Sequence, residues 1–271
     1  MSWQPASSPT EGAVETRDLV KQFGDFVAVD HLNLAVKRGS FFGFLGPNGA
    51  GKSTTIKMLT GLLSPTSGQL RVLGLDITAQ PMEVKKRIGV VPEDLNLFER
   101  LTGAEMLAFT GRMYGLTKTD IAQRGKELLE LMELQDEPKK LIIEYSHGMK
   151  KKLSLACALI HRPEILFLDE PFEGVDAIAS RTLKDLLSRL TARGLTVFLT
   201  SHVLEIVERL CTDIAIIAQG KLRAAGALDE LRKGIRLNDD GQGPVSLEEY
   251  FIHVVGGTRS TGEEDVLQWL T

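Results

Sequence analysis

Apolar residues alternate with polar ones or gather in short runs over the N-terminal third of the chain, and turn residues separate the runs. The partial alternation over 14–36 predicts β-strands, and the apolar run 40–45, bounded by glycines, is typical of a strand buried on both faces. A helix is predicted over 52–62, and further strands over 69–73 and 88–91. This part of the chain is therefore predicted to be mainly β-structure with one helix.

Between about residues 95 and 160 the strand pattern gives way to a helical one. Thr102 and Glu105 have the spacing of a capping box, in which each side chain bonds the other residue's backbone N–H, and they open an apolar helix. A broad apolar face predicts a second helix over about 119–134, and a third is expected over about 148–161. We therefore expect a helical subdomain here.

After Pro163 strands and helices alternate again. The expected strands are 165–168, 196–200 and 213–218, and the expected helices are about 178–193 and 203–210. Strands that alternate with helices form parallel sheets with right-handed crossovers. The predicted fold class is α/β: a mostly parallel sheet, an N-terminal antiparallel β portion and an inserted helical subdomain.

Composition and the chain ends refine this division. Residues 1–13, rich in Ser and Pro, predict a flexible tail, residues 14–230 the main domain, and residues 231–271 a C-terminal extension. In the extension, Ser246 and Glu249 form a second capping box that starts a short helix. Hydrophobic residues make up 43% and charged residues 25%, which is typical of globular proteins.

The charge balance and the apolar runs exclude several classes of protein. A formal net charge of −4 gives no overall field for binding nucleic acid, so no nucleic-acid partner is expected. No run approaches the roughly 18 apolar residues that span a bilayer, and the start of the chain has no secretory leader pattern. Cys157 and Cys211 match no metal spacing, so buried reduced thiols in a cytoplasmic protein are expected.

A phosphate-binding loop follows the strand predicted at 40–45. Residues 46–54 match the pattern G-x-x-x-x-G-K-[ST] between a predicted strand and a predicted helix. Glycines in such a loop let successive backbone N–H groups turn toward phosphate oxygens, and the helix N-terminus adds positive potential. The expected nucleotide contacts are Gly46, Pro47, Asn48, Gly49, Ala50, Gly51, Lys52, Ser53 and Thr54. Lys52 is expected at the β and γ phosphates, and the Ser53 hydroxyl at Mg²⁺.

Two acids end the strand predicted at 165–168. Buried strands do not normally end in paired carboxylates unless a cation or a reaction requires them. We therefore expect Asp169 to hold Mg²⁺ through water, and Glu170 to orient or deprotonate an attacking water. Together with the loop, these acids predict a P-loop nucleotide hydrolase. No N-K-x-D motif appears, which disfavours a GTPase.

Three further segments narrow the class of hydrolase. They are the run Tyr145-Ser146-His147-Gly148-Met149-Lys150 before the acidic pair, the run Glu173-Gly174-Val175-Asp176 after it, and His202 at the end of the next strand. With these motifs, in this order, the chain resembles the ATP-binding subunit of an ATP-binding cassette (ABC) transporter over about residues 14–230. The resemblance makes 14–230 an ABC ATPase domain with its helical subdomain at about 95–160.

The resemblance also implies roles for single residues. Ser146 and Gly148 belong to the family's signature motif and are expected to grip the γ-phosphate of ATP held by another subunit. A Ser-x-Gly at a helix N-terminus is by itself an anion site, which agrees with that role. His202 corresponds to the histidine that contacts the γ-phosphate, and Asp176 to the loop that joins the two sites. Phe23 matches the aromatic residue that stacks on adenine; an ordinary core Phe is the alternative.

Two departures from the family pattern stand out. Glu93 occupies the position where the family usually has a glutamine that touches Mg²⁺ or the attacking water. A carboxylate there is expected either to ligate Mg²⁺ or to contact it through water. In the signature segment, Tyr145, His147 and Met149 replace commoner residues, and this form resembles the ATPase subunits of bacterial drug, sodium and antibiotic exporters.

The resemblance implies partners as well as a substrate. ATP and Mg²⁺ are expected in a site shared with a second copy of the chain or a homologous subunit. The other partner is an integral membrane permease, with this chain on the inner face of the membrane. The permease is expected to contact the groove near Leu95, Leu97, Phe98, Leu101 and Met106, although core packing explains these residues as well. A soluble cassette ATPase acting on ribosomes, DNA or metal-cluster assembly remains the alternative.

Overall fold

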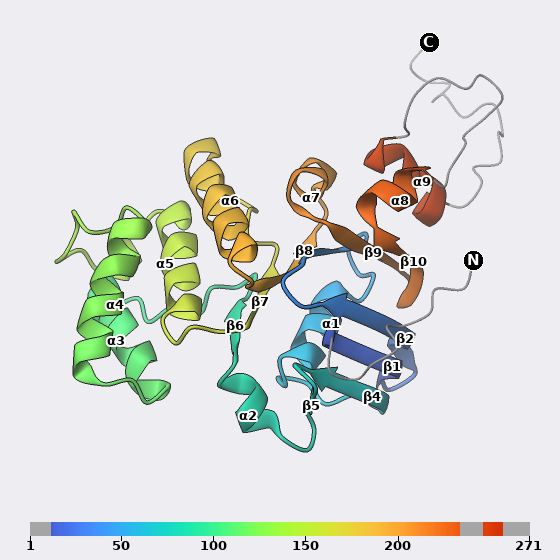
Figure 1. Cartoon of the computed structure of the whole chain (residues 1–271), viewed down its shortest axis with the longest axis horizontal. Coiled ribbons are helices and arrows are strands. Elements are labelled where there is room, and N and C mark those ends of the chain that lie inside the picture. The colour runs from blue at the N-terminus through green and yellow to red at the C-terminus, as the bar shows by residue number, and fades with distance from the viewer. Residues whose placement is uncertain (1–11, 234–245, 257–271) are drawn as a thin grey trace, which may run out of the picture.

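The computed structural model describes residues 12–233 and 246–256, and Figure 1 shows how their elements are arranged. A six-stranded sheet has the order β10-β9-β3-β8-β7-β6, in which β10 pairs antiparallel with β9 and all other pairs are parallel. Its strands are β3 (Phe41–Leu45), β6 (Ile88–Val91), β7 (Ile165–Asp169), β8 (Thr196–Ser201), β9 (Asp213–Ala218) and β10 (Lys221–Ala227). The predicted α/β class with a mostly parallel sheet is confirmed.

A second sheet is antiparallel, with the order β2-β1-β4-β5. Its strands are β1 (Gly12–Phe23), β2 (Phe26–Lys37), β4 (Ser67–Val72) and β5 (Leu75–Asp76). Gly12 and Ala13, assigned above to the tail, lie in β1: Gly12 pairs with Lys37, and Ala13 is fully buried. The tail boundary at residue 13 is therefore wrong, because pairing with β2 orders these residues; residues 1–11 lie outside the described part.

Every predicted helix is present, with its ends shifted by at most three residues. The helices are α1 (Lys52–Leu59), α2 (Pro81–Lys85), α3 (Gly103–Met113), α4 (Lys118–Leu131), the 3₁₀ turn η1 (Ile142–Glu144), α5 (His147–Leu159), α6 (Ala177–Ala192), α7 (Leu204–Leu210), α8 (Leu228–Lys233) and α9 (Leu247–Gly256). Of these, α2, η1 and α8 were not predicted. The capping box of Thr102 and Glu105 is present at the start of α3. In Figure 1, α3–α6 lie together at the left, away from β1, β2 and β4.

The parallel strands lie between two hydrophobic cores, and successive side chains along a strand face one core and then the other. Phe42 and Phe44 of β3 face the core shared with α1 and the antiparallel sheet. Phe41 and Leu45 of the same strand face the other core, which also contains residues of α5, α6 and α7. Both faces of β3 are thus covered, which explains its uninterrupted apolar run.

Within the C-terminal extension, the described helix α9 packs on the main domain. Helix α9 contacts α7, β9 and β10, with Leu247 fully buried and Tyr250 nearly so. The second capping box is formed, since the backbone N–H groups of Ser246 and Glu249 each donate to the other's side chain. Residues 234–245 and 257–271 of the extension lie outside the described residues.

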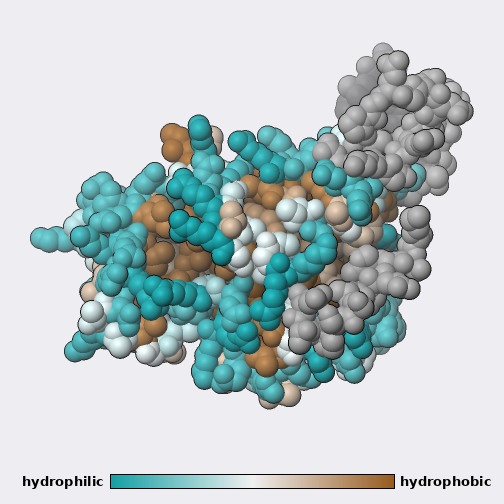
Figure 2. All heavy atoms as spheres, in the orientation of Figure 1, coloured by the Kyte–Doolittle hydropathy of each residue, from teal (hydrophilic) through white to brown (hydrophobic). Residues whose placement is uncertain are grey.

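The surface and the thiols agree with a globular domain. Figure 2 shows hydrophilic side chains over most of the face drawn, with hydrophobic residues gathered in recesses over the helices at the left. Among residues 12–233 and 246–256, no helix is long and apolar enough to cross a bilayer. Cys157 and Cys211 are buried free thiols, and burial raises the pKa of Cys157 to about 12.

Candidate functional site

The phosphate-binding loop joins the end of β3 to the start of α1. Gly51, the N-cap of α1, has a φ of 106°, which favours glycine, and a Cβ there would lie 2.6 Å from the Ala28 carbonyl oxygen. A Cβ on Gly46 would lie 2.3 Å from the Ile217 carbonyl oxygen. Only glycine therefore fits at these two positions, and the loop lies close against neighbouring backbone with the N-terminus of α1 open.

Lys52 directs its ammonium back into this loop. Its Nζ donates to the carbonyl oxygens of Gly46 (2.7 Å) and Pro47 (3.3 Å) and lies 3.7 Å from Glu170 Oε1. The side chain is only 7% exposed. A buried ammonium with one carboxylate and two carbonyls around it is ready to exchange those partners for phosphate oxygens, which carry more negative charge.

The two acids at the end of β7 are held by the neighbouring strand. Because β7 and β8 are parallel and in register, Thr200 lies opposite Asp169. The Thr200 hydroxyl donates to Asp169 Oδ1 at 2.5 Å and accepts the backbone N–H of Glu170 at 3.1 Å. Both acids are at least nine-tenths buried. Thr200 thus fixes the pair that sequence analysis assigned to Mg²⁺ and water.

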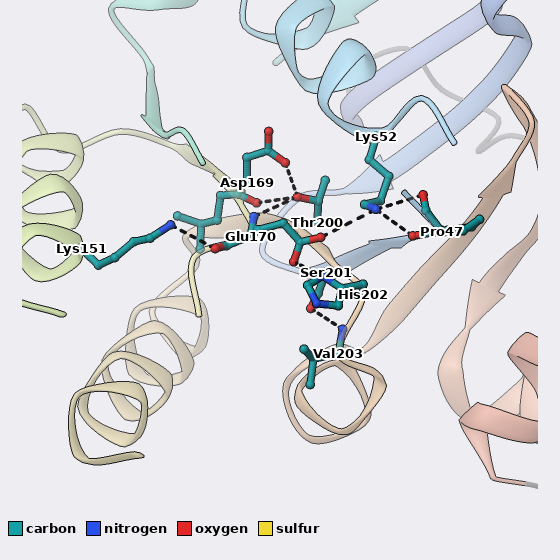
Figure 3. A network of polar contacts seen from close by, with 11 residues as sticks. Pro47, Lys52, Lys151, Asp169, Glu170, Thr200, Ser201, His202 and Val203 are labelled. Atoms are coloured by element: carbon teal, nitrogen blue, oxygen red, sulfur yellow. Dashed lines mark hydrogen bonds and ion pairs between the residues drawn. The ribbon is translucent and has the colours of Figure 1, made fainter. Parts of the chain in front are cut away.

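The Glu170 side chain lies between two cationic or potentially cationic groups. Its Oε2 is 3.1 Å from His202 Nδ1, and its Oε1 faces Lys52 without a hydrogen bond (Figure 3). Glu170 also has a φ of +46°, in the left-handed region that costs a non-glycine residue about 1–3 kcal/mol. The carboxylate is therefore aimed at the loop by a strained backbone, with one buried oxygen left for a further partner.

A cavity of about 460 Å³ collects most of the predicted site residues. Its lining residues are Phe26, Ala28, Pro47, Asn48, Gly49, Ala50, Gly51, Lys52, Ser53, Thr54, Glu93, Glu170, Glu173 and His202. Phe23 is not among the described residues that line it. Its half-exposed ring lies at the end of β1 with Lys21 Nζ 4.9 Å from the ring centre, and Phe26 of the same hairpin lines the cavity instead.

Negative charge concentrates at one end of the cavity. Partial desolvation raises the pKa of Glu93, and the charges of Asp169 and Glu173 raise it further. Within the described residues, no group of three or more His, Cys, Asp or Glu side chains could hold a metal ion alone. Mg²⁺ is usually bound through one or two carboxylates together with substrate phosphates and water. Ser53, Asp169 and Glu93 suit that mode, and the excess of carboxylates here favours a divalent cation.

The signature residues form a separate cluster. Ser146 is the N-cap of α5 and accepts the Met149 N–H, and Asp176 caps α6 through the N–H groups of Ile178 and Ala179. These two bonds, with the Ala179 bond the larger cause, lower the pKa of Asp176. A Cβ on Gly148 would lie 3.3 Å from Asp176 Oδ2. Ser146, Gly148 and Asp176 are not among the residues that line the Lys52 cavity.

Three site residues escaped sequence analysis: Thr200, Phe26 and Glu173. Thr200 is recognisable only once β8 is placed beside β7, because its role depends on the register. Phe26 lies three residues beyond Phe23 in the same hairpin and lines the cavity, whereas Phe23 does not; stacking of an aromatic residue on adenine stays a prediction. Glu173 belongs to a run that sequence analysis noted without giving it a role.

Comparisons with known proteins show which family this chain belongs to. The model of the family described as ABC transporter matches residues 29–173 of the 271. The bacitracin transport ATP-binding protein BcrA of Bacillus licheniformis is 40% identical over 248 residues, which cover 89% of this chain and 80% of BcrA. The probable multidrug ABC transporter ATP-binding protein YbhF of Escherichia coli is also 40% identical, over 92% of this chain. The chain spans only 42% of the length of YbhF.

Solved structures lead to the same family. A structure described as the ATP-binding subunit of an ABC transporter superposes with a TM-score of 0.81 at 30% identity and covers 89% of this chain and 99% of its own. A cassette solved as a dimer with ADP and phosphate shares the fold, with a TM-score of 0.73 at 24% identity over 79% of this chain and 98% of its own. With a family match over more than half of its length, the chain belongs to the ABC transporter family.

Proposed function

We propose that this chain binds Mg²⁺·ATP in the Lys52 cavity and hydrolyses it, and that hydrolysis powers export through a separate membrane permease. The observation that supports this most is the convergence of Lys52, Glu170 and His202 on one cavity beside an open helix N-terminus. This arrangement combines a phosphate cradle with a buried carboxylate, as phosphoryl transfer to water requires.

Each group has a definite task in this proposal. The backbone N–H groups of the loop and the Lys52 ammonium bind the β and γ phosphates. Ser53 and Asp169 hold Mg²⁺, which when bound neutralises phosphate charge. Glu170 orients the attacking water and accepts its proton, since its Oε1 is buried and lacks a hydrogen bond. His202, whose Nδ1 lies 3.1 Å from Glu170 Oε2, contacts the γ-phosphate in this proposal.

A complete site takes two copies of the chain, or one copy and a homologous subunit. Ser146 and Asp176 are exposed, and Ser146 caps a helix whose N-terminus favours an anion. Yet neither residue lines the cavity that holds Lys52. In a two-fold dimer, the signature cluster of one copy can face the cavity of the other, so that ATP binds both surfaces.

The permease and the direction of transport rest on the relatives. The printed names of those described above are of a bacitracin transport protein and a probable multidrug transporter. A daunorubicin/doxorubicin resistance ATP-binding protein of Streptomyces peucetius is also 40% identical, over 86% of this chain and 70% of its own length. By analogy we infer an exporter subunit that works on the inner face of the membrane, rather than a cassette ATPase of ribosomes, DNA or metal clusters.

The test is single-turnover and steady-state ATP hydrolysis by the purified protein. Glu170→Gln is expected to bind Mg²⁺·ATP about as tightly as the wild type but to hydrolyse it at least about a hundredfold more slowly, because the proton acceptor is lost. Lys52→Ala is expected to weaken nucleotide binding itself by about tenfold or more. The exposed Lys57→Ala on the same helix is the matched control. Undiminished hydrolysis by Glu170→Gln contradicts the proposed mechanism.

A further inference from the structure

Lys151 is a buried cation to which the site as described gives no task. It lies in the second turn of α5, is 2% exposed, and sits outside the Lys52 cavity. Its Nζ donates to the backbone carbonyl oxygens of Glu170 at 3.1 Å and Glu93 at 3.4 Å. Figure 3 shows the side chain extending from α5 to the Glu170 backbone. Burying an ammonium is costly, so its retention here calls for a specific use.

The environment of Lys151 explains how the charge is tolerated. Burial lowers the pKa of Lys151, whereas the negative charges of Glu173, Glu93, Asp169 and Glu170 raise it. The ammonium thus faces the carboxylates that line or adjoin the cavity, but bonds backbone oxygens rather than carboxylates. It offsets part of their charge and leaves their oxygens free for other partners.

The Glu170 backbone needs external support. A glutamate with a φ of +46° keeps this conformation only where its surroundings determine it. On one side, the Glu170 N–H donates to the Thr200 hydroxyl at 3.1 Å. On the other side, the Glu170 carbonyl accepts from Lys151 in a charge-assisted bond, the stronger kind. Lys151 therefore fixes one peptide group beside the strained residue.

The same end of α5 is joined to the segment that follows β6. The Lys150 ammonium lies 2.8 Å from Glu99 Oε1, and the Tyr145 hydroxyl bonds the backbone of Gly103. Lys151 adds a third link, to the carbonyl of Glu93. The helix that Ser146 begins is thus tied to the whole run from Glu93 to Gly103.

We propose that Lys151 is a positioning residue, which holds the Glu170 backbone in its left-handed conformation and couples Glu170 and Glu93 to the helix that begins at Ser146. This inference rests on the proposed hydrolysis of ATP. A phosphate that binds at the N-terminus of α5 can then influence the position of the Glu170 carboxylate through Lys151, which lies about one helical turn away.

The first test separates positioning from binding. Lys151→Met is expected to lower kcat about tenfold or more while KM for Mg²⁺·ATP changes less than about twofold, since the loop and Lys52 are intact. Lys151→Arg, which keeps charge and donors, is expected to recover most of the loss. The matched control is Lys152→Met: Lys152 is on the same helix and also buried, but its Nζ bonds Glu133 at 2.7 Å.

The second test needs no nucleotide and no turnover. In hydrogen exchange of the nucleotide-free protein, Lys151→Met is expected to speed exchange of amides in residues 170–174 about tenfold, and Lys152→Met is not. If the methionine variant does not fold, Lys151→Gln, which keeps a donor without the charge, replaces it in both tests.

The outcomes distinguish the two proposals. The inference is overturned if Lys151→Met keeps the kcat and the exchange rates of the wild type. It is also overturned if Lys152→Met lowers kcat and speeds exchange as much as Lys151→Met does. A wild-type protein that binds but never hydrolyses ATP overturns the proposed function instead, and the exchange measurement still decides whether Lys151 holds Glu170.

Discussion

Glu93 lies at the exposed rim of the cavity, within the field of Asp169 and Glu173. Partial desolvation and these charges raise the pKa of its carboxyl, which means that the ionised form is disfavoured until a cation arrives. A glutamine at position 93 would carry no charge with which to attract the cation. At the scale of a single residue, we therefore expect this carboxylate to adjust how strongly the site binds a divalent cation.

Glu93→Gln is expected to raise the Mg²⁺ concentration for half-maximal hydrolysis by about tenfold, as one charge–charge contact is lost. Because the pKa of Glu93 is raised, its carboxylate is protonated at a higher pH than an ordinary glutamate. The difference between wild type and variant should therefore shrink as the pH falls through that raised pKa. Magnesium titrations at several pH values measure this, with the neighbouring Asp94→Asn as the control. An unchanged requirement removes Glu93 from the metal site.

Residues that act through register or backbone strain were beyond sequence analysis. Asp169, Glu170 and Lys52 were predictable because a strand-end acid pair and a glycine loop are chemically unusual. Thr200 looked like any strand threonine, and Lys151 like one of three consecutive lysines. Their partners lie 31 and 19 residues away along the chain, and only the packing of β8 and α5 against β7 brings them together.

At the scale of elements, the segment between β6 and α3 has two kinds of apolar residue. Met106 is buried, and Leu95, Leu97 and Leu101 pack against the core. Phe98 is 52% exposed and makes an edge-to-face contact with Phe109, which is 42% exposed. The expected permease groove is thus largely core packing, and we propose the exposed aromatic pair as the contact surface.

We expect the double variant Phe98→Ala, Phe109→Ala to lose co-purification with an integral membrane partner after detergent extraction, because aromatic side chains dominate such contacts. Hydrolysis by the purified subunit alone should stay within about twofold of the wild type, since neither residue lines the Lys52 cavity. Leu62→Ala, which truncates another exposed apolar side chain, serves as control. Retained co-purification would place the permease contact elsewhere.

The elements that sequence analysis found are those with a strong periodic signal. Strands 88–91 and 213–218 agree with the structure to the residue, because both are buried runs bounded by turn signals. The elements it missed are short or at an edge: β5 has two residues, η1 three, α2 five and α8 six, and within the described part of the chain β10 pairs only with β9. Such elements are stabilised by contacts with neighbours rather than by their own pattern.

At the scale of the whole molecule, the phosphate cradle and the signature cluster are two separate surfaces that one copy does not join. Ser146 is well suited to test the proposed dimer, because it both caps α5 and is exposed. Asp and Asn are about as good as Ser at an N-cap, so either substitution leaves the helix start intact. They differ in charge, and only Asp repels a phosphate.

In the Glu170→Gln background, added ATP is expected to double the mass measured by light scattering, since hydrolysis no longer reopens the dimer. Adding Ser146→Asp should abolish this dimer while leaving the ATP affinity of the single subunit within about twofold. Adding Ser146→Asn instead should preserve most of the ATP-induced dimer. A dimer that forms equally well with aspartate at position 146 argues against a phosphate at the start of α5.

Residue type and order along the chain were enough to predict the α/β class, the phosphate loop and the acid pair, because each depends on local sequence. The resemblance of the motifs to a known family was enough to predict the family. The tertiary structure alone decided that Ala13 belongs to β1, that α9 packs on the core, that Phe26 rather than Phe23 lines the cavity, and that Lys151 supports Glu170. These four depend on contacts between distant segments. A single sequence carries no local signal for such contacts.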